Sequence, residues 1–184
     1  MLGLSAFLGG VIGIVVAGTL EFDAQHDLGG LPMLGVVLIE ETSKLIIPLA
    51  ILLLLGHYRT PANGLLIGVA AGAGFAALET MGYGFSTLLA SQGSITATVD
   101  TLVLRGFLSP AGHMAWTGIT AAALFAAAAS GWQRRPVLEF VGAVVLHGLW
   151  DSQKSLIGMA VVAVVSLAVL GFTVHRCSVS ARYR

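Results

Sequence analysis

Long apolar runs make up most of the chain and limit the folds that it can adopt. Four runs cover about residues 2–20, 31–55, 63–90 and 102–130, and the stretch 137–175 is long enough for two more around a polar turn at 151–155. About 20 apolar residues in a helix cross the hydrocarbon core of a bilayer. Only 10% of the 184 residues are charged, whereas soluble domains average about 25%. The sequence therefore predicts an all-α polytopic membrane protein, one domain over residues 1–184 with about six transmembrane helices.

The charged loops predict how these helices are oriented. Segment 21–30 is acidic, and six of the nine Lys and Arg residues fall on the other side of the membrane, together with both termini. Positive charge marks the cytoplasmic side, so both termini are expected in the cytoplasm. No Lys or Arg precedes the first run, which we interpret as a retained helix rather than a signal peptide. The net charge of zero makes nucleic acid an unexpected partner.

A few ionisable side chains interrupt the apolar runs. A charge at the bilayer centre costs at least about 2.5–3.5 kcal/mol, so such residues are functional candidates. At a rise of 1.5 Å per residue, those in the second, third and fourth runs lie about 14–16 Å below the outer ends of their helices. Similar depths predict one polar cavity in the outer half of the bilayer. The candidates are Glu40, Glu41, Lys44, Glu79, Arg105, His113, His147 and Asp151.

Spacing along single helices pairs several of these groups. Glu40 and Lys44 are four residues apart and share a helix face, as do His147 and Asp151. Lys44 can therefore neutralise a carboxylate, and Asp151 can orient the imidazole of His147. Pro48 leaves the carbonyl of Lys44 without its helical donor. Freed backbone at membrane depth is tolerated where it lines a cavity.

The chemistry of this set favours proton transfer with activation of water. A carboxylate can serve as general acid or base, and imidazoles can stabilise an oxyanion or bind a metal. The alternative function is a proton-coupled transporter or channel, because acids and histidines also form proton relays. Transporters commonly carry internal repeats, and this sequence shows none. Arg105 is expected either to extend toward the outer interface or to support the site.

Four short motifs resemble those of the PrsW family of bacterial intramembrane proteases, which are distant relatives of the CAAX-processing proteases. They are EETSK (40–44), FAALE (75–79), SPAGH (109–113) and HGLWD (147–151), in the family's order, within about residues 36–152. The resemblance implies a plasma-membrane protease that cuts a membrane-anchored protein or peptide at or near the outer face. In the better-known members the substrate is an anti-sigma factor.

The resemblance also implies roles for individual residues, within a catalytic core of about residues 31–152. Glu40 and Glu41 match the essential glutamates, one of which activates water. Glu79 matches the partner of that base, and His147 with Asp151 matches the motif thought to stabilise the oxyanion. With His113, these six are the expected catalytic residues. The expected supporting residues are Lys44, Phe75 and Arg105.

The requirement for metal stays open in the sequence. Glu79, His113 and His147 could supply a three-ligand zinc site with an open position. The strong zinc-protease signature HExxH is absent, and a metal-free glutamate mechanism needs no further assumption. We slightly prefer the metal-free mechanism, with Zn²⁺ as the alternative.

Overall fold

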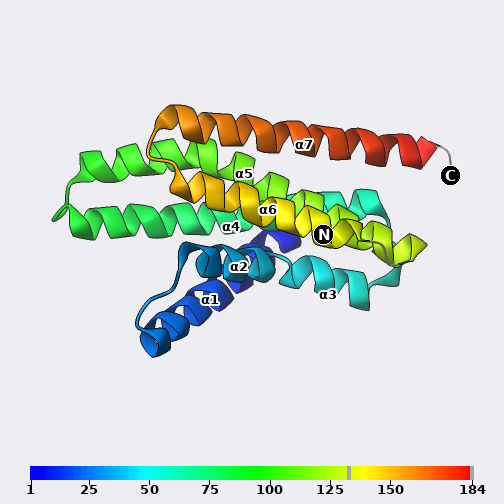
Figure 1. The fold of residues 1–184 in the computed structure, drawn as a ribbon, viewed down its shortest axis with the longest axis horizontal. Helices are drawn as coiled ribbons and strands as arrows, with labels where there is room; N and C mark the ends of the chain where they lie inside the picture. Colours follow the sequence, from blue (N-terminus) through cyan, green and yellow to red (C-terminus); the bar gives the residue numbers. More distant parts are fainter. Residues whose placement is uncertain (132–133, 183–184) are drawn as a thin grey trace.

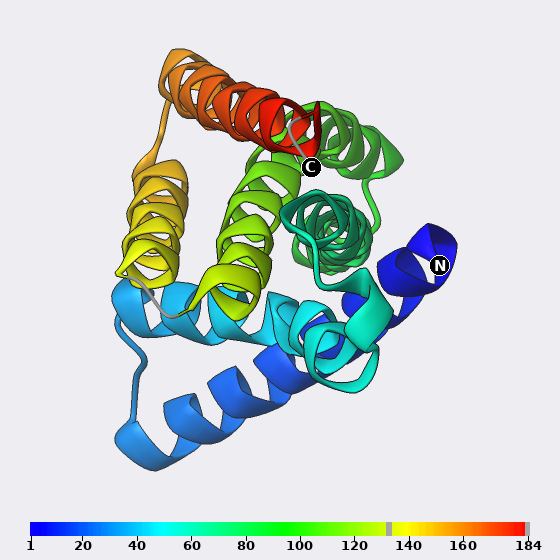
Figure 2. The ribbon, with the colours of Figure 1, turned by 90° about the vertical axis from the view of Figure 1, so that its right-hand side faces the viewer.

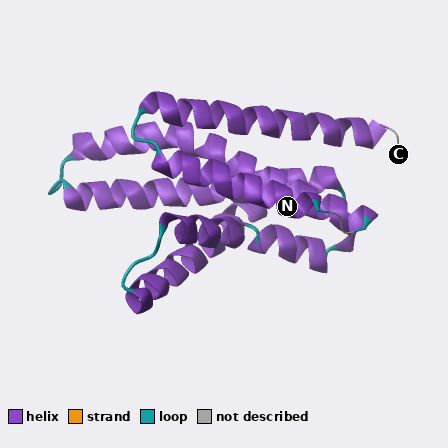
Figure 3. Cartoon of the chain, viewed as in Figure 1, coloured by secondary structure: helices purple, strands orange, loops and turns teal. Residues whose placement is uncertain are grey.

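The chain folds entirely into helices in the part that the structure describes. This computed structural model describes residues 1–131 and 134–182, and those residues contain no strand (Figures 1 and 3). The all-α prediction is confirmed. The elements in chain order are α1 (Leu2–Leu28), α2 (Met33–Lys44), α3 (Ile46–Leu54), the short 3-10 helix η1 (Gly56–Tyr58), α4 (Pro61–Ala90), α5 (Ile95–Ser130), α6 (Arg135–Ser152) and α7 (Leu156–Arg182).

The second apolar run differs from the single helix expected over 31–55. It is divided into α2, which ends at Lys44, and α3, which begins at Ile46. Pro48 has no N–H to offer the carbonyl of Lys44. At the same point the Leu45 N–H turns back to the Thr42 carbonyl, at 3.1 Å. The break therefore lies directly beside the ionisable residues of this run.

Two helices are longer than their apolar runs predict. α1 continues through the acidic segment, which was expected as a loop, to Leu28, and Gly29 ends it with a left-handed φ of 69°. Glu21 is therefore helical. α5 begins at Ile95 rather than near residue 102, because the Ser94 side chain caps it by accepting the Ala97 N–H at 3.3 Å.

Three of the described helices are long and apolar enough to cross a membrane, namely those at Leu2–Leu28, Pro61–Ala90 and Leu156–Val179. The count of six spans and the cytoplasmic position of both termini stay predictions. The α3–α4 and α5–α6 connections lie at one end of the bundle with the C-terminus, and the α1–α2 and α4–α5 connections lie at the other (Figure 1). Arg184 of the basic tail and the side chain of Arg182 lie outside the described residues.

Glycines allow α4 to pack closely against both of its neighbours. α4 and α5 form the central antiparallel hairpin, and α1 crosses α4 (Figure 2). A Cβ atom at Gly10 of α1 would lie 2.7 Å from the backbone of Gly74, and one at Gly68 would lie 2.5 Å from the Thr117 carbonyl oxygen. Small residues at helix crossings let backbones approach in lipid. This approach brings the ionisable residues of α4 and α5 together.

The crossing predicts a difference between two glycines of α4. A Cβ at Gly72 would meet the His113 carbonyl and lie 3.1 Å from the Met114 Cα, whereas one at Gly82 would meet nothing within 4 Å. Gly72→Ala is therefore expected to lower the free energy of unfolding by about 1–3 kcal/mol, the usual cost of overpacking. Gly82→Ala is the matched control and should not destabilise. Thermal unfolding of both variants in detergent tests this, and equal stabilities would contradict it.

α6 and α7 cover the other side of α5. Trp116 of α5 is fully buried in an apolar cluster with Ala143 of α6 and Val162 of α7. Its indole Nε1 donates a hydrogen bond to the Ser166 hydroxyl of α7 at 2.9 Å. α6 is thus held beside α5, and it also contacts α2. Figure 2 shows α6 beside α5.

Candidate active site

The end of α2 carries a buried lysine between two carboxylates. The side chain of Lys44 is 0% exposed, and its Nζ lies 2.7 Å from Oε1 of Glu41 and 3.3 Å from Oε2 of Glu40. The ammonium also lies over the ring of Phe75, 4.4 Å from its centroid, in a cation–π contact. The pairing of Lys44 with Glu40 predicted from their spacing is confirmed. Phe75, expected as a supporting residue, contacts Lys44 rather than the acids.

His147 of α6 connects both glutamates of α2. Its Nδ1 lies 2.8 Å from Oε1 of Glu41, and its Nε2 lies 3.5 Å from both Oε2 of Glu40 and Oδ2 of Asp151. Glu41 is 2% exposed and Asp151 is 30% exposed. The carboxylate that fixes the ring is therefore Glu41, while Asp151 lies on the more open side. The sequence spacing pointed to Asp151 as a residue that can orient His147, and the structure adds Glu41 as the closer carboxylate.

Glu79 joins α4 to α5 on the other side of the site. Its Oε2 lies 2.7 Å from Nη2 of Arg105 and 3.0 Å from Nε2 of His113. The Arg105 contact is a hydrogen-bonded ion pair. The His113 contact has hydrogen-bond distance, but its N–H direction is off the line to the oxygen. Arg105 therefore contacts a site residue and does not simply extend to the interface.

The two imidazoles lie next to each other against Trp116. The ring centroids of His113 and His147 are 5.2 Å apart, and the His147 ring stacks on the indole at 4.6 Å. Trp116, which contacts both rings, was not predicted as a site residue from the sequence. The available signal was its spacing, one helical turn after His113 on α5. The indole and its bond to Ser166 thus support both histidines.

Two further residues at this site were not predicted from the sequence. Tyr83 lies one turn after Glu79 on α4, and the Arg105 guanidinium is 3.6 Å from its ring centroid. Glu21 of α1 is half-buried, and its Oε1 is buried without a hydrogen-bond partner among the described residues. Glu21 was missed because its segment was expected to be a loop.

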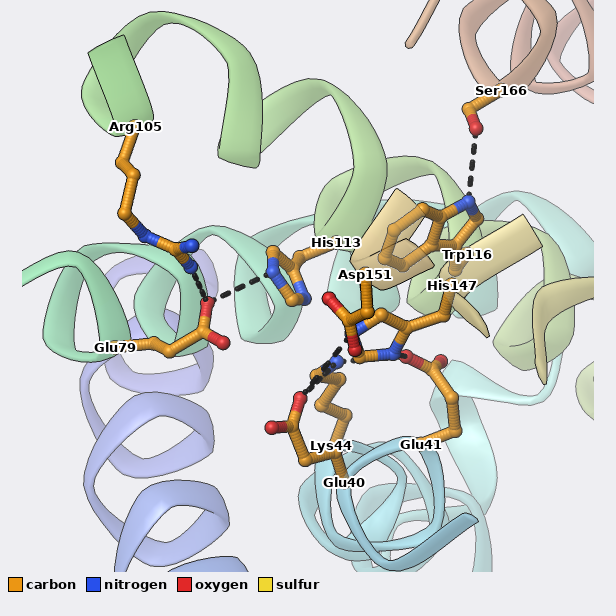
Figure 4. Close-up of polar contacts among 10 residues, drawn as sticks. All are labelled: Glu40, Glu41, Lys44, Glu79, Arg105, His113, Trp116, His147, Asp151 and Ser166. Carbon is orange, nitrogen blue, oxygen red and sulfur yellow. Dashed lines mark hydrogen bonds and ion pairs between the residues drawn. The ribbon is translucent and has the colours of Figure 1, made fainter. Parts of the chain in front are cut away.

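The residues present fit a metal ion. Glu40, His113 and His147 each bring one ligand atom to within 4.8 Å of the others. The Nδ1 of His113 is buried and has no hydrogen-bond partner in the described part of the chain, and it points toward this group (Figure 4). Imidazole nitrogen and carboxylate oxygen are typical zinc ligands. Glu79, expected as a ligand, lies on the far side of His113, so its role as a ligand stays a prediction that this geometry does not favour.

The charges of the site agree with a divalent cation. Four carboxylates contact the cluster and two cationic side chains accompany them, so the acidic groups outnumber the basic ones by two. Buried charges need compensation, and a divalent metal or bound protons would provide it. The carboxylates are Glu40, Glu41, Glu79 and Asp151, and the cations are Lys44 and Arg105 (Figure 4).

Fold and site together define a helical membrane protein with acids and histidines gathered at one buried centre. Residues 1–174 match the model of a family described as PrsW family intramembrane metalloprotease. The chain belongs to this family and is an intramembrane protease, as the four motifs indicated. Comparisons with curated proteins and with solved structures gave no match.

Family membership bears on two open alternatives. It identifies an enzyme, so it favours the protease over the transporter or channel. The family description is that of a metalloprotease, and the Glu40–His113–His147 group fits a metal. The slight preference for a metal-free mechanism is therefore not supported, and a bound metal becomes the better expectation.

Proposed function

We propose that this chain is an endopeptidase that hydrolyses a peptide bond of a membrane-anchored protein at the centre formed by Glu40, His113 and His147. The observation that carries the proposal is the convergence of these three side chains, from α2, α5 and α6, at one buried point. Each ionisable side chain placed inside a membrane span costs free energy. Three of them meeting at one point, from three different helices, therefore indicates a function. The catalytic core is about residues 31–152 of a single domain.

Glu40 is the carboxylate that acts on water in this proposal. Its contacts with Lys44 and His147 both use Oε2, so Oε1 can accept a proton from an attacking water molecule. Its side chain is 12% exposed, compared with 2% for Glu41, which gives water better access to Glu40. Glu41 acts through its neighbours, by accepting a hydrogen bond from Nδ1 of His147 and by pairing with Lys44.

Glu40, His113 and His147 would hold the metal, and the preferred ion is Zn²⁺. When bound, such an ion polarises water and the carbonyl of the scissile bond. The ring of His147 is oriented by Glu41 at Nδ1, which turns Nε2 toward Glu40. Carboxylates commonly fix metal-binding histidines in this way.

The remaining predicted catalytic residues have supporting positions in this proposal. Glu79 holds His113 through Nε2. Asp151 is the most exposed of the four acids and lies 3.5 Å from Nε2 of His147. It can exchange a proton between this centre and the outer aqueous side. Phe75 keeps the Lys44 ammonium in place through its ring face.

The substrate and location follow from the proposed position of the site. With its site in the outer half of the bilayer, the enzyme would cut a membrane-anchored protein or peptide near the outer face of a bacterial plasma membrane. An anti-sigma factor is the substrate class we propose by analogy with better-known members of the family. The lipid bilayer is the second partner, and no nucleic acid is expected.

Metal content tests this function without a known substrate. The detergent-purified protein is expected to bind close to one Zn²⁺ per chain. The His113→Ala and His147→Ala variants should bind at least about 10-fold less tightly, since each loses a ligand and even residues behind the ligands matter 10–100-fold. Elemental analysis and competition with a coloured chelator measure both quantities.

The control for this measurement is His57→Ala, which removes an imidazole of η1 outside the cluster. It should leave zinc binding unchanged. If the parent protein binds no zinc under conditions in which it still cuts a membrane-anchored reporter, Glu40 acts without a metal and the metal part of the proposal fails.

A further inference from the structure

Arg105 is a charged residue at this site that none of the four family motifs includes. It lies on α5, two turns before His113, and its side chain is 18% exposed. Its Nη2 lies 2.7 Å from Oε2 of Glu79, and the Cζ of its guanidinium lies over the ring of Tyr83, 3.6 Å from the ring centroid. Glu79 and Tyr83 are one turn apart on α4, so both contacts of Arg105 reach the same face of the neighbouring helix.

A single oxygen of Glu79 connects Arg105 to His113. Oε2 of Glu79 is 2.7 Å from Nη2 of Arg105 and 3.0 Å from Nε2 of His113. A carboxylate on α4 without this cation could rotate away, because the His113 contact alone is not a linear hydrogen bond. The planar guanidinium stacked on Tyr83 removes that freedom, since arginine is held both by its ring contact and by its ion pair.

The position of Glu79 determines which nitrogen of His113 carries the proton. A carboxylate beside Nε2 can only accept a hydrogen bond there, so it favours the tautomer protonated at Nε2. The other nitrogen, Nδ1, then offers a free lone pair. Neither ring nitrogen makes a hydrogen bond of good geometry among the described residues, but Nε2 lies 3.0 Å from the Glu79 carboxylate, whereas Nδ1 has no such neighbour and points toward Glu40 and His147 (Figure 4).

We propose that Arg105 is a positioning residue that holds Glu79 against Nε2 of His113 and so keeps Nδ1 unprotonated and directed at the reacting centre. Tyr83 is the surface on which the guanidinium is held. The expected effect of Arg105 on metal affinity rests on the proposed function. Its expected effect on the tautomer of His113 does not. Arg105→Lys keeps the charge but loses the guanidinium that lies over the Tyr83 ring, so it should restore only part of the effect.

The deciding measurement is the tautomer of His113 in the metal-free protein. Nitrogen NMR of the chelator-treated protein in proteoliposomes, labelled at histidine, separates the two tautomers, and a His113→Gln sample assigns the signal. The parent is expected to show one His113 tautomer, protonated at Nε2. Arg105→Met should show a mixture of both, and Arg105→Lys should lie between them. An unchanged His113 signal in Arg105→Met would overturn the proposal.

Arg135→Met is the matched control, because it also breaks an arginine–glutamate pair, with Nε 3.3 Å from Oε1 of Glu139. This pair lies near the start of α6, outside the cluster, and the control should leave the His113 signal unchanged. A general loss of packing would instead appear in both variants and would overturn a specific role for Arg105.

Zinc affinity separates this proposal from the proposed function. Arg105→Met should weaken zinc binding about 10–100-fold, the usual effect of removing support behind a metal ligand, with Arg105→Lys in between. If the parent binds no zinc but the His113 tautomer still responds to Arg105→Met, the metal function fails and the positioning role stands. If zinc binds normally and neither readout responds, the positioning role fails and the metal function stands.

Discussion

Replacing Glu40 with glutamine is expected to lower the rate of peptide cleavage by about 10²–10⁴-fold, the usual contribution of a general base. The amide keeps the size of the side chain but cannot accept a proton, and it is a poorer metal ligand than a carboxylate. Oε2 of Glu40 accepts a hydrogen bond from Lys44 at 3.3 Å, and the amide oxygen of glutamine can keep that contact as a weaker hydrogen bond. The loss should therefore fall on the reaction rather than on folding.

The measurement is the initial rate at which proteoliposomes cut a fluorescent single-span reporter that the parent protein cleaves. Glu139→Gln is the control, because Glu139 is a partly exposed acid of α6 paired with Arg135 outside the cluster. It should keep the parental rate. A Glu40→Gln variant that retains more than half of that rate, with unchanged thermal unfolding, would remove Glu40 from the reacting centre.

The convergence of the site residues could be predicted because it depends on depth, which the sequence encodes. Apolar runs of known rise fix how far each polar side chain lies from the end of its helix. Glu40, Glu79 and His113 were expected at one level, and the structure joins them through contacts between α2, α4, α5 and α6. The pair of Lys44 with Glu40 was likewise predicted from helical spacing.

The choice among acids could not be predicted, because it depends on how each helix is rotated about its axis relative to its neighbours. Glycines of α1 and α4 allow close backbone contacts between α1, α4 and α5 that no single helix predicts. In the packed structure Glu79 faces Arg105, 26 residues later in the chain, whereas Glu40 lies with the two histidines. No spacing within one helix contains that information. The extension of α1 past residue 20, which makes Glu21 helical, was not predicted because residues 21–28 are mostly polar and were expected to form a loop.

Replacing Lys44 with methionine is expected to lower the free energy of unfolding by about 3–5 kcal/mol, as happens when one partner of a buried ion pair is removed. Lys44 is 0% exposed, and its Nζ lies 2.7 Å from Oε1 of Glu41. Without the ammonium, Glu41 keeps a buried charge opposed only by His147, to which it bonds at 2.8 Å. Methionine still fills the space over Phe75, so the loss of unfolding free energy measures the removal of the charge rather than a change in packing. Reversible unfolding in mixed detergent measures it.

The double variant Lys44→Met/Glu41→Gln separates the ion pair from the packing of α2. Glutamine can still accept the hydrogen bond from Nδ1 of His147 and carries no charge, so the double variant should be more stable than Lys44→Met alone. Arg135→Met, which breaks a partly exposed pair, should cost no more than about 1 kcal/mol. A Lys44→Met variant as stable as the parent would mean that the charges of α2 are compensated by another group. Glu41 also fixes the ring of His147. If Lys44→Met lowers the free energy of unfolding as expected, the same ion pair both stabilises α2 and supports the orientation of a candidate metal ligand.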